Sequence, residues 1–231
     1  MPKDDASLKT DDATTSKRKR LSRADREQQI VAEAVRYFAE VGFGGQTREL
    51  ARRIGISQSL LFRYFPTKDD IIERVYEEVY VQRWNPAWED LLADRSRPLE
   101  YRLQQFYKEY TAAIFEYEWV RIFVHSGITG ITFYHQYIKL IRDRVLKAIS
   151  VEMRHHCGLP DDADNPVSQR EIDLVWQLHG GIFYIAIRKY IYGYEDREDF
   201  YQVMEDSITT FLTGAPAIFE ACVPTEAGES E

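Results

Sequence analysis

Residues 46–68, QTRELARRIGISQSLLFRYFPTK, constrain the fold more than any other stretch of this chain. The pattern predicts a short helix, a tight turn and a second short helix. Leu50, Ala51 and Ile54 fall on one apolar face at helical spacing. Gly55 then breaks the run and permits the positive φ that a sharp turn between helices requires. The first helix is therefore expected to end at this glycine.

The second helix of this segment has its own start and stop signals. Thr47 and Ser57 are expected to cap the first and second helices, because their hydroxyls can accept hydrogen bonds from unpaired first-turn amides. Leu61 and Phe65, four residues apart, give the second helix a buried side. Pro66 ends it, since its ring cannot continue the helix. Two short helices joined by such a turn are typical of the helix-turn-helix, whose second helix can lie in the DNA major groove.

Residues 26–72 resemble the DNA-binding domain of TetR-type transcriptional regulators. The resemblance is carried, in order, by an amphipathic first helix, a Gly-Phe loop, Thr47, Leu50-Ala51, the block IGIS, an aromatic pair ending in Phe65, and Pro-Thr-Lys before an acidic helix start. It covers about a fifth of the chain. It implies an all-α protein of about nine helices, with an N-terminal three-helix helix-turn-helix DNA-binding domain and a C-terminal helical domain for ligand binding and dimerisation.

Charge is distributed unevenly along the chain. The net charge is −8, which taken alone argues against nucleic acid. Residues 17–68, however, carry twelve basic and five acidic side chains, a net charge of +7 that leaves the rest of the chain at −15. A basic module on an acidic body directs a polyanion to one end of the molecule.

Composition excludes several classes of protein. With 231 residues, 44% of them hydrophobic, the chain can build a sizeable core. No apolar run approaches the roughly 18 residues of a membrane span, and the N-terminus has no apolar signal region. Two cysteines without repeated spacing fit a reducing compartment. We therefore expect a cytoplasmic protein.

The predicted organisation has four parts: a disordered basic arm (1–21), a DNA-binding domain (22–67), a ligand-binding and dimerisation domain (68–214) and an acidic tail (215–231). The basic cluster at 17–20 precedes the first helix. It either contacts phosphates or the minor groove, or is a solvated charge run.

Helical periodicity continues beyond the helix-turn-helix. Outside that segment, helices are predicted over 22–41, 68–84, 98–115, 117–125, 133–156, 170–192 and 197–212, with a short helical piece, WEDLLAD, in the connection 86–97. Gly127 and Gly130 are expected to bound a loop, and Gly214-Ala-Pro216 to end the last helix.

The N-terminal end of the second helix is the part that meets base edges. Gln58 can read adenine, Ser59 is adaptable, and Leu60 can touch a thymine methyl. The resemblance implies phosphate contacts from Thr47, Tyr64 and Lys68. It also places Phe62 where the family usually has a tyrosine, so one phosphate-binding hydroxyl is missing. The complete predicted DNA-binding set is Thr47, Arg48, Ser57, Gln58, Ser59, Leu60, Phe62, Arg63, Tyr64 and Lys68. The alternative is a helical hairpin without DNA function.

The C-terminal region is dense in aromatic residues. The family resemblance implies an apolar cavity with a few polar tips, whereas ordinary core packing would use the same residues. The predicted pocket residues are Trp88, Phe106, Tyr110, Phe123, Tyr134, Trp176, His179 and Phe183.

Gly180-Gly181 lies inside a predicted helix, where each glycine costs about 1 kcal/mol relative to alanine. The pair permits close approach of another helix, or is a neutral kink. The resemblance implies that the last two long helices form a dimer interface, for which the predicted residues are Gly180, Gly181, Ile187, Tyr201 and Ile208.

No catalytic or cofactor motif is present, neither GxSxG nor a P-loop nor GxGxxG. His155, His156 and Cys157 are adjacent but lack metal-ligand spacing, so neither metal nor cofactor is expected. The residues and the resemblance together predict a homodimeric regulator, most often a repressor in this family, released from a palindromic operator in double-stranded DNA by a small, largely hydrophobic ligand. Two alternatives are a regulator with no small-molecule ligand, and an enzyme or carrier with a vestigial helix-turn-helix.

Overall fold

The protein is built from helices joined by short loops. The computed structural model describes residues 21–130, 132–163, 165–194 and 199–223, and no strand occurs among them. The helices are α1 (Arg23–Val41), α2 (Thr47–Ile54), α3 (Gln58–Tyr64), α4 (Lys68–Tyr76), the π-helical turn η1 (Glu77–Val81), α5 (Ala87–Ala93), α6 (Leu99–Ile114), α7 (Tyr117–Thr129), α8 (Thr132–Ile141), the π-helical turn η2 (Arg142–Leu146), α9 (Lys147–Cys157), α10 (Gln169–Tyr190) and α11 (Phe200–Glu220). The predicted all-α fold is confirmed.

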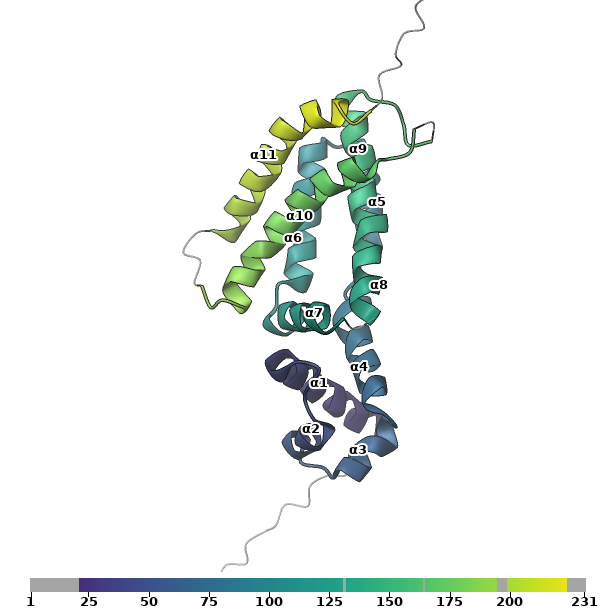
Figure 1. Ribbon diagram of the computed structural model, residues 1–231, viewed down its shortest axis with the longest axis vertical. Helices are drawn as coiled ribbons and strands as arrows, with labels where there is room; N and C mark the ends of the chain where they lie inside the picture. Colours follow the sequence, from purple (N-terminus) through teal and green to yellow (C-terminus); the bar gives the residue numbers. More distant parts are fainter. Residues whose placement is uncertain (1–20, 131, 164, 195–198, 224–231) are drawn as a thin grey trace, which may run out of the picture.

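The helices form a small N-terminal unit and a larger body. Figure 1 shows α1, α2 and α3 gathered at one end, with α4 leading into the body and α7 lying crosswise against α1. Because η1 continues α4 and η2 joins α8 to α9, the described residues form ten continuous helices. The short piece WEDLLAD is a helix of its own, α5, and accounts for the tenth.

The N-terminal unit closes around one apolar core. Ile30, Ala34 and Phe38 repeat at every fourth position along α1 and are fully buried. Leu50 from α2 and Leu61 from α3 are fully buried in the same cluster. Burying one such leucine stabilises the fold by roughly 1.5–3 kcal/mol. This core holds α3 against α1 and α2 and leaves the opposite face of α3 in solvent.

Most helix ends in this unit follow the sequence signals. Gly55 takes the left-handed conformation (φ 76°) after α2, and Ser57 caps α3 by accepting a hydrogen bond from the amide of Leu60 at 3.2 Å. The predicted cap at Thr47 is wrong. Thr47 is the first residue of α2, and the capping position belongs to Gln46, which makes no side-chain cap bond.

Several helix ends in the body differ from the sequence prediction. α7 continues through Gly127 and ends at Gly130, which takes a left-handed conformation (φ 66°). The helix that begins at Lys68 ends with η1 at Val81, three residues earlier than expected. α10 ends at Tyr190 rather than at residue 192.

The last helix differs most, because α11 begins at Phe200 and runs through Pro216 to Glu220. A proline inside a helix removes one hydrogen bond and crowds the preceding turn, but Ala215 and Phe219 on the same turns are buried in the core. Packing therefore outweighs the proline signal, and the helical body continues past the predicted boundary at residue 214. The start predicted at Arg197 lies outside the described residues.

Two buried ion pairs tie the body together. Arg154 in α9 donates two hydrogen bonds to Glu171 in α10, one of them from Nη2 to Oε2 at 2.7 Å. Arg102 in α6 donates to Glu152 in α9, also at 2.7 Å. All four side chains are at most 7% exposed. Charges buried in this way require partners, so the pairs fix α9 against both neighbouring helices.

The predicted basic cluster at residues 17–20 and the last eight residues of the predicted acidic tail lie outside the described ranges. Within those ranges, no helix is both long and apolar enough to cross a membrane. The same part of the chain contains no group of three metal-ligating side chains.

Candidate nucleic-acid interface and interior cavity

The outer face of α3 forms the candidate nucleic-acid interface. Ser59 and Arg63 are exposed on this face, and Gln58 and Leu60 are partly exposed. Leu61 points the other way, into the core. Figure 1 places α3 at the end of the molecule farthest from α10 and α11. A short helix exposed in this way can enter a groove without interference from the body.

Two of the predicted DNA-binding residues contact each other. The Gln58 side chain donates a hydrogen bond from Nε2 to the hydroxyl oxygen of Thr47, at 2.9 Å. This contact joins the start of α2 to the start of α3. The second amide hydrogen of Gln58 and its carbonyl oxygen remain available, and these are the groups that pair with adenine.

Several cations on or near α3 have no carboxylate partner in the described structure. Arg48 and Arg63 are exposed and have no ion-pair partner among the described residues. Lys68 donates to the carbonyl of Phe43, which holds its ammonium group beside the loop between α1 and α2. Three other arginines are paired with carboxylates: Arg36 with Glu33, Arg52 with Glu49 and Arg53 with Glu40. Arg23 and Arg26 in α1 also have no carboxylate partner among the described residues, so Arg48, Arg63 and Lys68 are the unpaired cations on or near α3.

The charge on this end also depends on the N-terminal cluster. Of the net +7 carried by residues 17–68, +4 belongs to residues 17–20, outside the described part, and +3 to the rest. Phe62 and Tyr64 are partly buried, and Tyr64 packs against the core. The described part of the interface is thus modestly basic.

Comparison with known proteins identifies this unit. A family model described as "Bacterial regulatory proteins, tetR family" matches residues 30–75, the stretch from within α1 to within α4.

The N-terminal unit of this chain is a TetR-family unit.

Solved structures of two proteins of the TetR type have similar folds. A TetR-like transcriptional regulator from Rhodococcus sp. RHA1 has a TM-score of 0.62 at 18% identity, over 84% of this chain and 100% of that one. A TetR-family transcriptional regulator from Streptomyces coelicolor has a TM-score of 0.57 at 18% identity, over 90% and 94% of the two chains. The likeness extends the TetR fold to the body. The N-terminal unit is accordingly the DNA-binding unit of a transcription regulator.

The body contains a partly open cavity of about 190 Å³. It is lined by Tyr110, Trp119, Phe123, Tyr134, Tyr137, Ile138, Ile141, Trp176, His179, Gly180 and Phe183. Six of the eight predicted pocket residues are in this lining. Trp88 and Phe106 are not, because they pack behind Tyr110 with ring centroids 5.5 and 5.4 Å from its own.

The sequence prediction missed five lining residues: Trp119, Tyr137, Ile138, Ile141 and Gly180. A usable signal existed for three of them. Tyr134, Tyr137, Ile138 and Ile141 recur at helical spacing and place one side of α8 against the cavity. Nothing local distinguishes Trp119 from the other aromatic residues of α7.

The polar groups of the cavity are uncharged. The hydroxyl oxygens of Tyr110 and Tyr137 lie 2.7 Å apart and share a hydrogen bond, and burial raises the pKa of both phenols. Burial lowers the pKa of His179 to about 4, so its imidazole is neutral at pH 7. His179 also stacks on Trp176 at an interplanar angle of 4°. The cavity therefore offers hydrogen bonds but no countercharge.

Two sets of contacts link the cavity to the DNA-binding unit. Trp119 and Phe123 of α7 line the cavity, whereas Arg121 on another side of the same helix donates to the carbonyl of Ala39 in α1 at 2.7 Å. The ring of Tyr80 in η1 lies 5.0 Å from the ring of Trp119. The same ring is also 5.0 Å from that of Tyr137. The connection through α7 and the connection through Tyr80 thus both start from residues that line the cavity.

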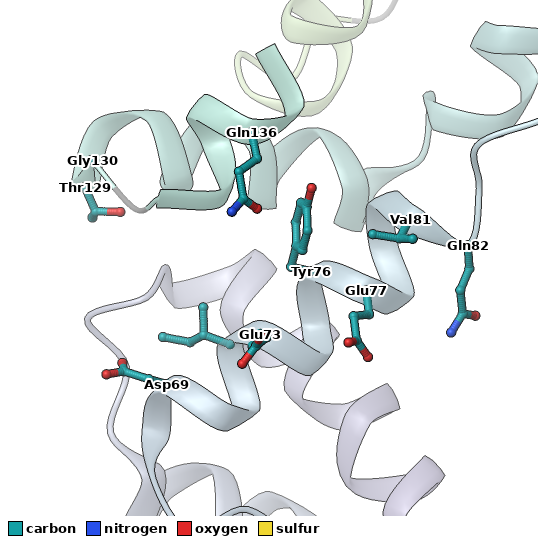
Figure 2. A pocket seen from close by; sticks show the side chains of 10 residues that line it. Asp69, Glu73, Tyr76, Glu77, Val81, Gln82, Thr129, Gly130 and Gln136 are labelled. Atoms are coloured by element: carbon teal, nitrogen blue, oxygen red, sulfur yellow. The ribbon is translucent and has the colours of Figure 1, made fainter. Parts of the chain in front are cut away.

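An open groove lies between α4 and the body. Its volume is about 860 Å³, and it separates α4 and η1 from the corner between α7 and α8. Figure 2 shows Tyr76 extending from α4 toward the body beside Gln136, which extends down from α8. Glu73 and Glu77 line the α4 side. α4 therefore has space on this side and packs against α1 elsewhere.

The predicted dimer residues occupy different environments. Gly180 and Gly181 are exposed, and a Cβ added to either would meet nothing within 4 Å in this chain. Tyr201 is 42% exposed and Ile187 is partly buried. Ile208 is fully buried in the core of its own chain, so its assignment to an interface is wrong. The glycines make no close helix contact within one chain.

Proposed function

We propose that this TetR-family regulator acts as a homodimeric repressor that binds a palindromic operator and is released by a small, largely hydrophobic effector held in the cavity. The observation that carries the proposal is the double role of α7. Its Trp119 and Phe123 line the cavity, and its Arg121 binds the end of α1. A molecule that reshapes the cavity wall therefore acts on the helix that supports the DNA-binding unit.

Sequence reading falls to the N-terminal end of α3. Gln58, Ser59 and Leu60 contact base edges, and Ser57 supports them because its hydroxyl lies 3.0 Å from that of Ser59. Arg63, one turn later, contacts a guanine or a phosphate. The remaining residues of the predicted set position the unit on the backbone: Thr47, Arg48, Phe62, Tyr64 and Lys68.

Dimerisation uses the outer faces of α10 and α11. A groove of about 500 Å³ lies between the two helices and includes Gly181, Val203 and Thr210. The adjacent Tyr184 is 52% exposed. A second copy packed here would cover these apolar groups. It would also set the two α3 helices apart, and successive major grooves on one side of the duplex require a spacing of roughly 34–36 Å.

Release by the effector follows from a change in the distance between the two α3 helices of the dimer. Tyr80 links η1 to the cavity walls at Trp119 and Tyr137. The groove beside α4 leaves this helix room to move. An effector that binds better to the form with α4 displaced shifts the population away from the spacing that fits DNA.

The deciding experiment is selection from a pool of random duplexes by the full-length protein at moderate salt, with sequencing of the retained DNA. An enriched palindrome with half-sites about one helical turn apart is expected. Retention without any enriched sequence would contradict the operator part of the proposal. Sedimentation of the protein on the enriched duplex then gives the stoichiometry, for which two copies are expected.

A further inference from the structure

The cavity has no ionised side chain in its lining. Its described walls carry only hydrocarbon, aromatic rings, phenol hydroxyls, indole groups and one imidazole. Burial keeps that imidazole, on His179, uncharged at pH 7. A carboxylate or ammonium group entering the cavity would lose its hydration without gaining a counterion, which is costly.

One wall of the cavity carries an unsatisfied donor. Trp119 is 1% exposed, and its indole Nε1–H is buried without a hydrogen-bond partner in the described structure. Buried donors are almost always paired, so an orphan in a cavity wall indicates a group that a bound molecule satisfies. The matching group on that molecule is a hydrogen-bond acceptor.

The tyrosine pair adds a second donor. The hydroxyls of Tyr110 and Tyr137 share one hydrogen bond of 2.7 Å, and two hydroxyls carry two hydrogens. One O–H hydrogen of the pair therefore has no acceptor among the hydrogen bonds of the described residues. An acceptor such as a carbonyl oxygen has two lone pairs and can bind both this hydrogen and the indole N–H.

The walls and the volume restrict the rest of the molecule. Trp119, Phe123, Trp176 and Phe183 present aromatic faces and edges, which favour another aromatic ring. The cavity volume is about 190 Å³. An apolar cavity of about 150 Å³ in another protein holds benzene. The available space therefore suits one substituted ring.

We propose that the effector of this regulator is an uncharged, single-ring aromatic compound with a carbonyl-type acceptor, bound through the indole N–H of Trp119 and the spare hydrogen of the Tyr110–Tyr137 pair. This inference rests on the proposed function, because it takes the cavity to be the effector site. It adds the charge, the size and the hydrogen-bonding character of the effector.

Calorimetry on the full-length wild-type protein at pH 7.5 tests the proposal with four probes of similar size. Acetophenone has the ring and the acceptor, ethylbenzene lacks the acceptor, benzoate adds a charge, and cyclohexyl methyl ketone lacks the aromatic ring. Acetophenone is expected to bind about tenfold tighter than ethylbenzene and at least about 100-fold tighter than benzoate. It is expected to bind about threefold tighter than the saturated ketone.

Three outcomes would overturn the proposal. They are binding of benzoate at a strength similar to acetophenone, equal binding of acetophenone and ethylbenzene, and no binding of any probe. Equal or tighter binding of the saturated ketone would overturn its aromatic part.

A matched pair of variants assigns the donor. Trp119→Phe removes the orphan N–H, and we expect it to reduce the ratio of acetophenone to ethylbenzene affinity to about two or less. Trp176→Phe makes the same chemical change on another wall, where the indole is partly exposed, and is expected to keep the wild-type ratio. An equal fall in both variants would contradict the role of Trp119. The four-probe comparison needs no variant, so it decides the effector class even if Trp119→Phe does not fold.

DNA binding separates this inference from the proposed function. If acetophenone binds but does not release the selected duplex, the cavity chemistry stands and the effector role fails. If the protein selects a palindrome but binds none of the probes, the DNA-binding role stands and the effector class is wrong.

Discussion

The body buries two ion pairs, whereas the ion pairs of the DNA-binding unit reach the solvent. In the N-terminal unit the ion pairs are exposed, as in Arg52–Glu49, where the side chains are 75% and 39% exposed. In the body, the paired side chains of Arg154 and Glu171 are at most 2% exposed. Exposed charges cost little to rearrange and can meet a polyanion, whereas buried charges hold helices in one arrangement.

This difference matches the DNA binding of one region and the effector binding that we propose for the other. The end that meets DNA keeps Arg48 and Arg63 unpaired among the described residues and in solvent. The body keeps its buried charges in closed pairs, and none of them belongs to the lining of the cavity. A binding site for an uncharged molecule can exist there because the buried charges are satisfied elsewhere.

The largest expected effect comes from breaking a buried pair. Arg154→Ala leaves the carboxylate of Glu171 buried without its cation and is expected to destabilise the fold by about 3–5 kcal/mol. Arg52→Ala, the matched change at the exposed pair, is expected to leave the melting temperature unchanged. Chemical denaturation of the two variants measures the difference. A similar, small loss in both would show that the buried pair does not hold α9 to α10.

Lowering the pH should also remove the stability that the buried ion pair of the body contributes. Burial opposes ionisation of Glu171, but hydrogen bonds from Arg154 and Ser168 outweigh it and hold the pKa of this carboxyl below its ordinary 4.5. A lowered pKa stabilises the folded state above pH 4.5, and this contribution is lost as the pH falls below that value. Glu171→Gln should therefore lose less stability than the wild type between pH 5 and pH 3. Melting curves across this range provide the measurement, and parallel losses in both proteins would exclude the effect.

At the DNA end, variants of base-contacting and phosphate-contacting side chains should have different effects on binding. Gln58→Ala is expected to weaken binding to the selected duplex by about 1–3 kcal/mol and to leave binding to random DNA unchanged. Lys68→Ala should weaken both, and should reduce the dependence of log K on log salt by about one. Titrations of both duplexes at several salt concentrations measure these effects. Equal losses on the two duplexes for Gln58→Ala would remove its base-reading role.

The two regions also differ in how much their sequence reveals. The turn at Gly55 and the cap at Ser57 are local features, so contiguous residues predict them correctly. The hydrogen bond between Thr47 and Gln58 joins two helices, and no local signal indicates it. The capping role predicted for Thr47 fails for another reason, because α2 begins one residue earlier than a cap at Thr47 requires.

In the body, the site is assembled from distant segments. The cavity combines side chains from α6, α7, α8 and α10, so Trp119 cannot be distinguished from other aromatic residues by its neighbours in sequence. Pro216 is a local stop signal that the buried Phe219 overrides. Ile208 shows the same limit, because helical spacing does not say which neighbour a side chain faces.

The connection between the regions can be weakened at Arg121. Arg121→Met removes the hydrogen bonds to the carbonyls of Ala39, Glu40 and Tyr190 but keeps an apolar stem of similar length. We expect operator affinity to change little and the release of DNA by effector to fall by about 5-fold, a typical coupling between two sites. Operator titrations with and without effector measure this. Unchanged release would indicate that the cavity is coupled to the DNA-binding unit through Tyr80 and α4 instead.

The smallest expected effect tests the dimer surface at Gly181. Alanine is a better helix former than glycine by about 1 kcal/mol, and an added Cβ meets nothing in this chain, so Gly181→Ala should stabilise each subunit. If a second copy packs closely on this face, the same methyl group should weaken dimerisation about fivefold, because tight interfaces accommodate added volume poorly. Gly214→Ala, an exposed helical glycine outside the groove, is the control and should stabilise the fold without changing dimerisation. Sedimentation and denaturation of both variants separate the two contributions. Stabilisation by Gly181→Ala with an unchanged dimer constant would place the interface elsewhere. A methyl group added inside a closely packed interface must change the dimer constant, so an unchanged constant means that no partner approaches Gly181.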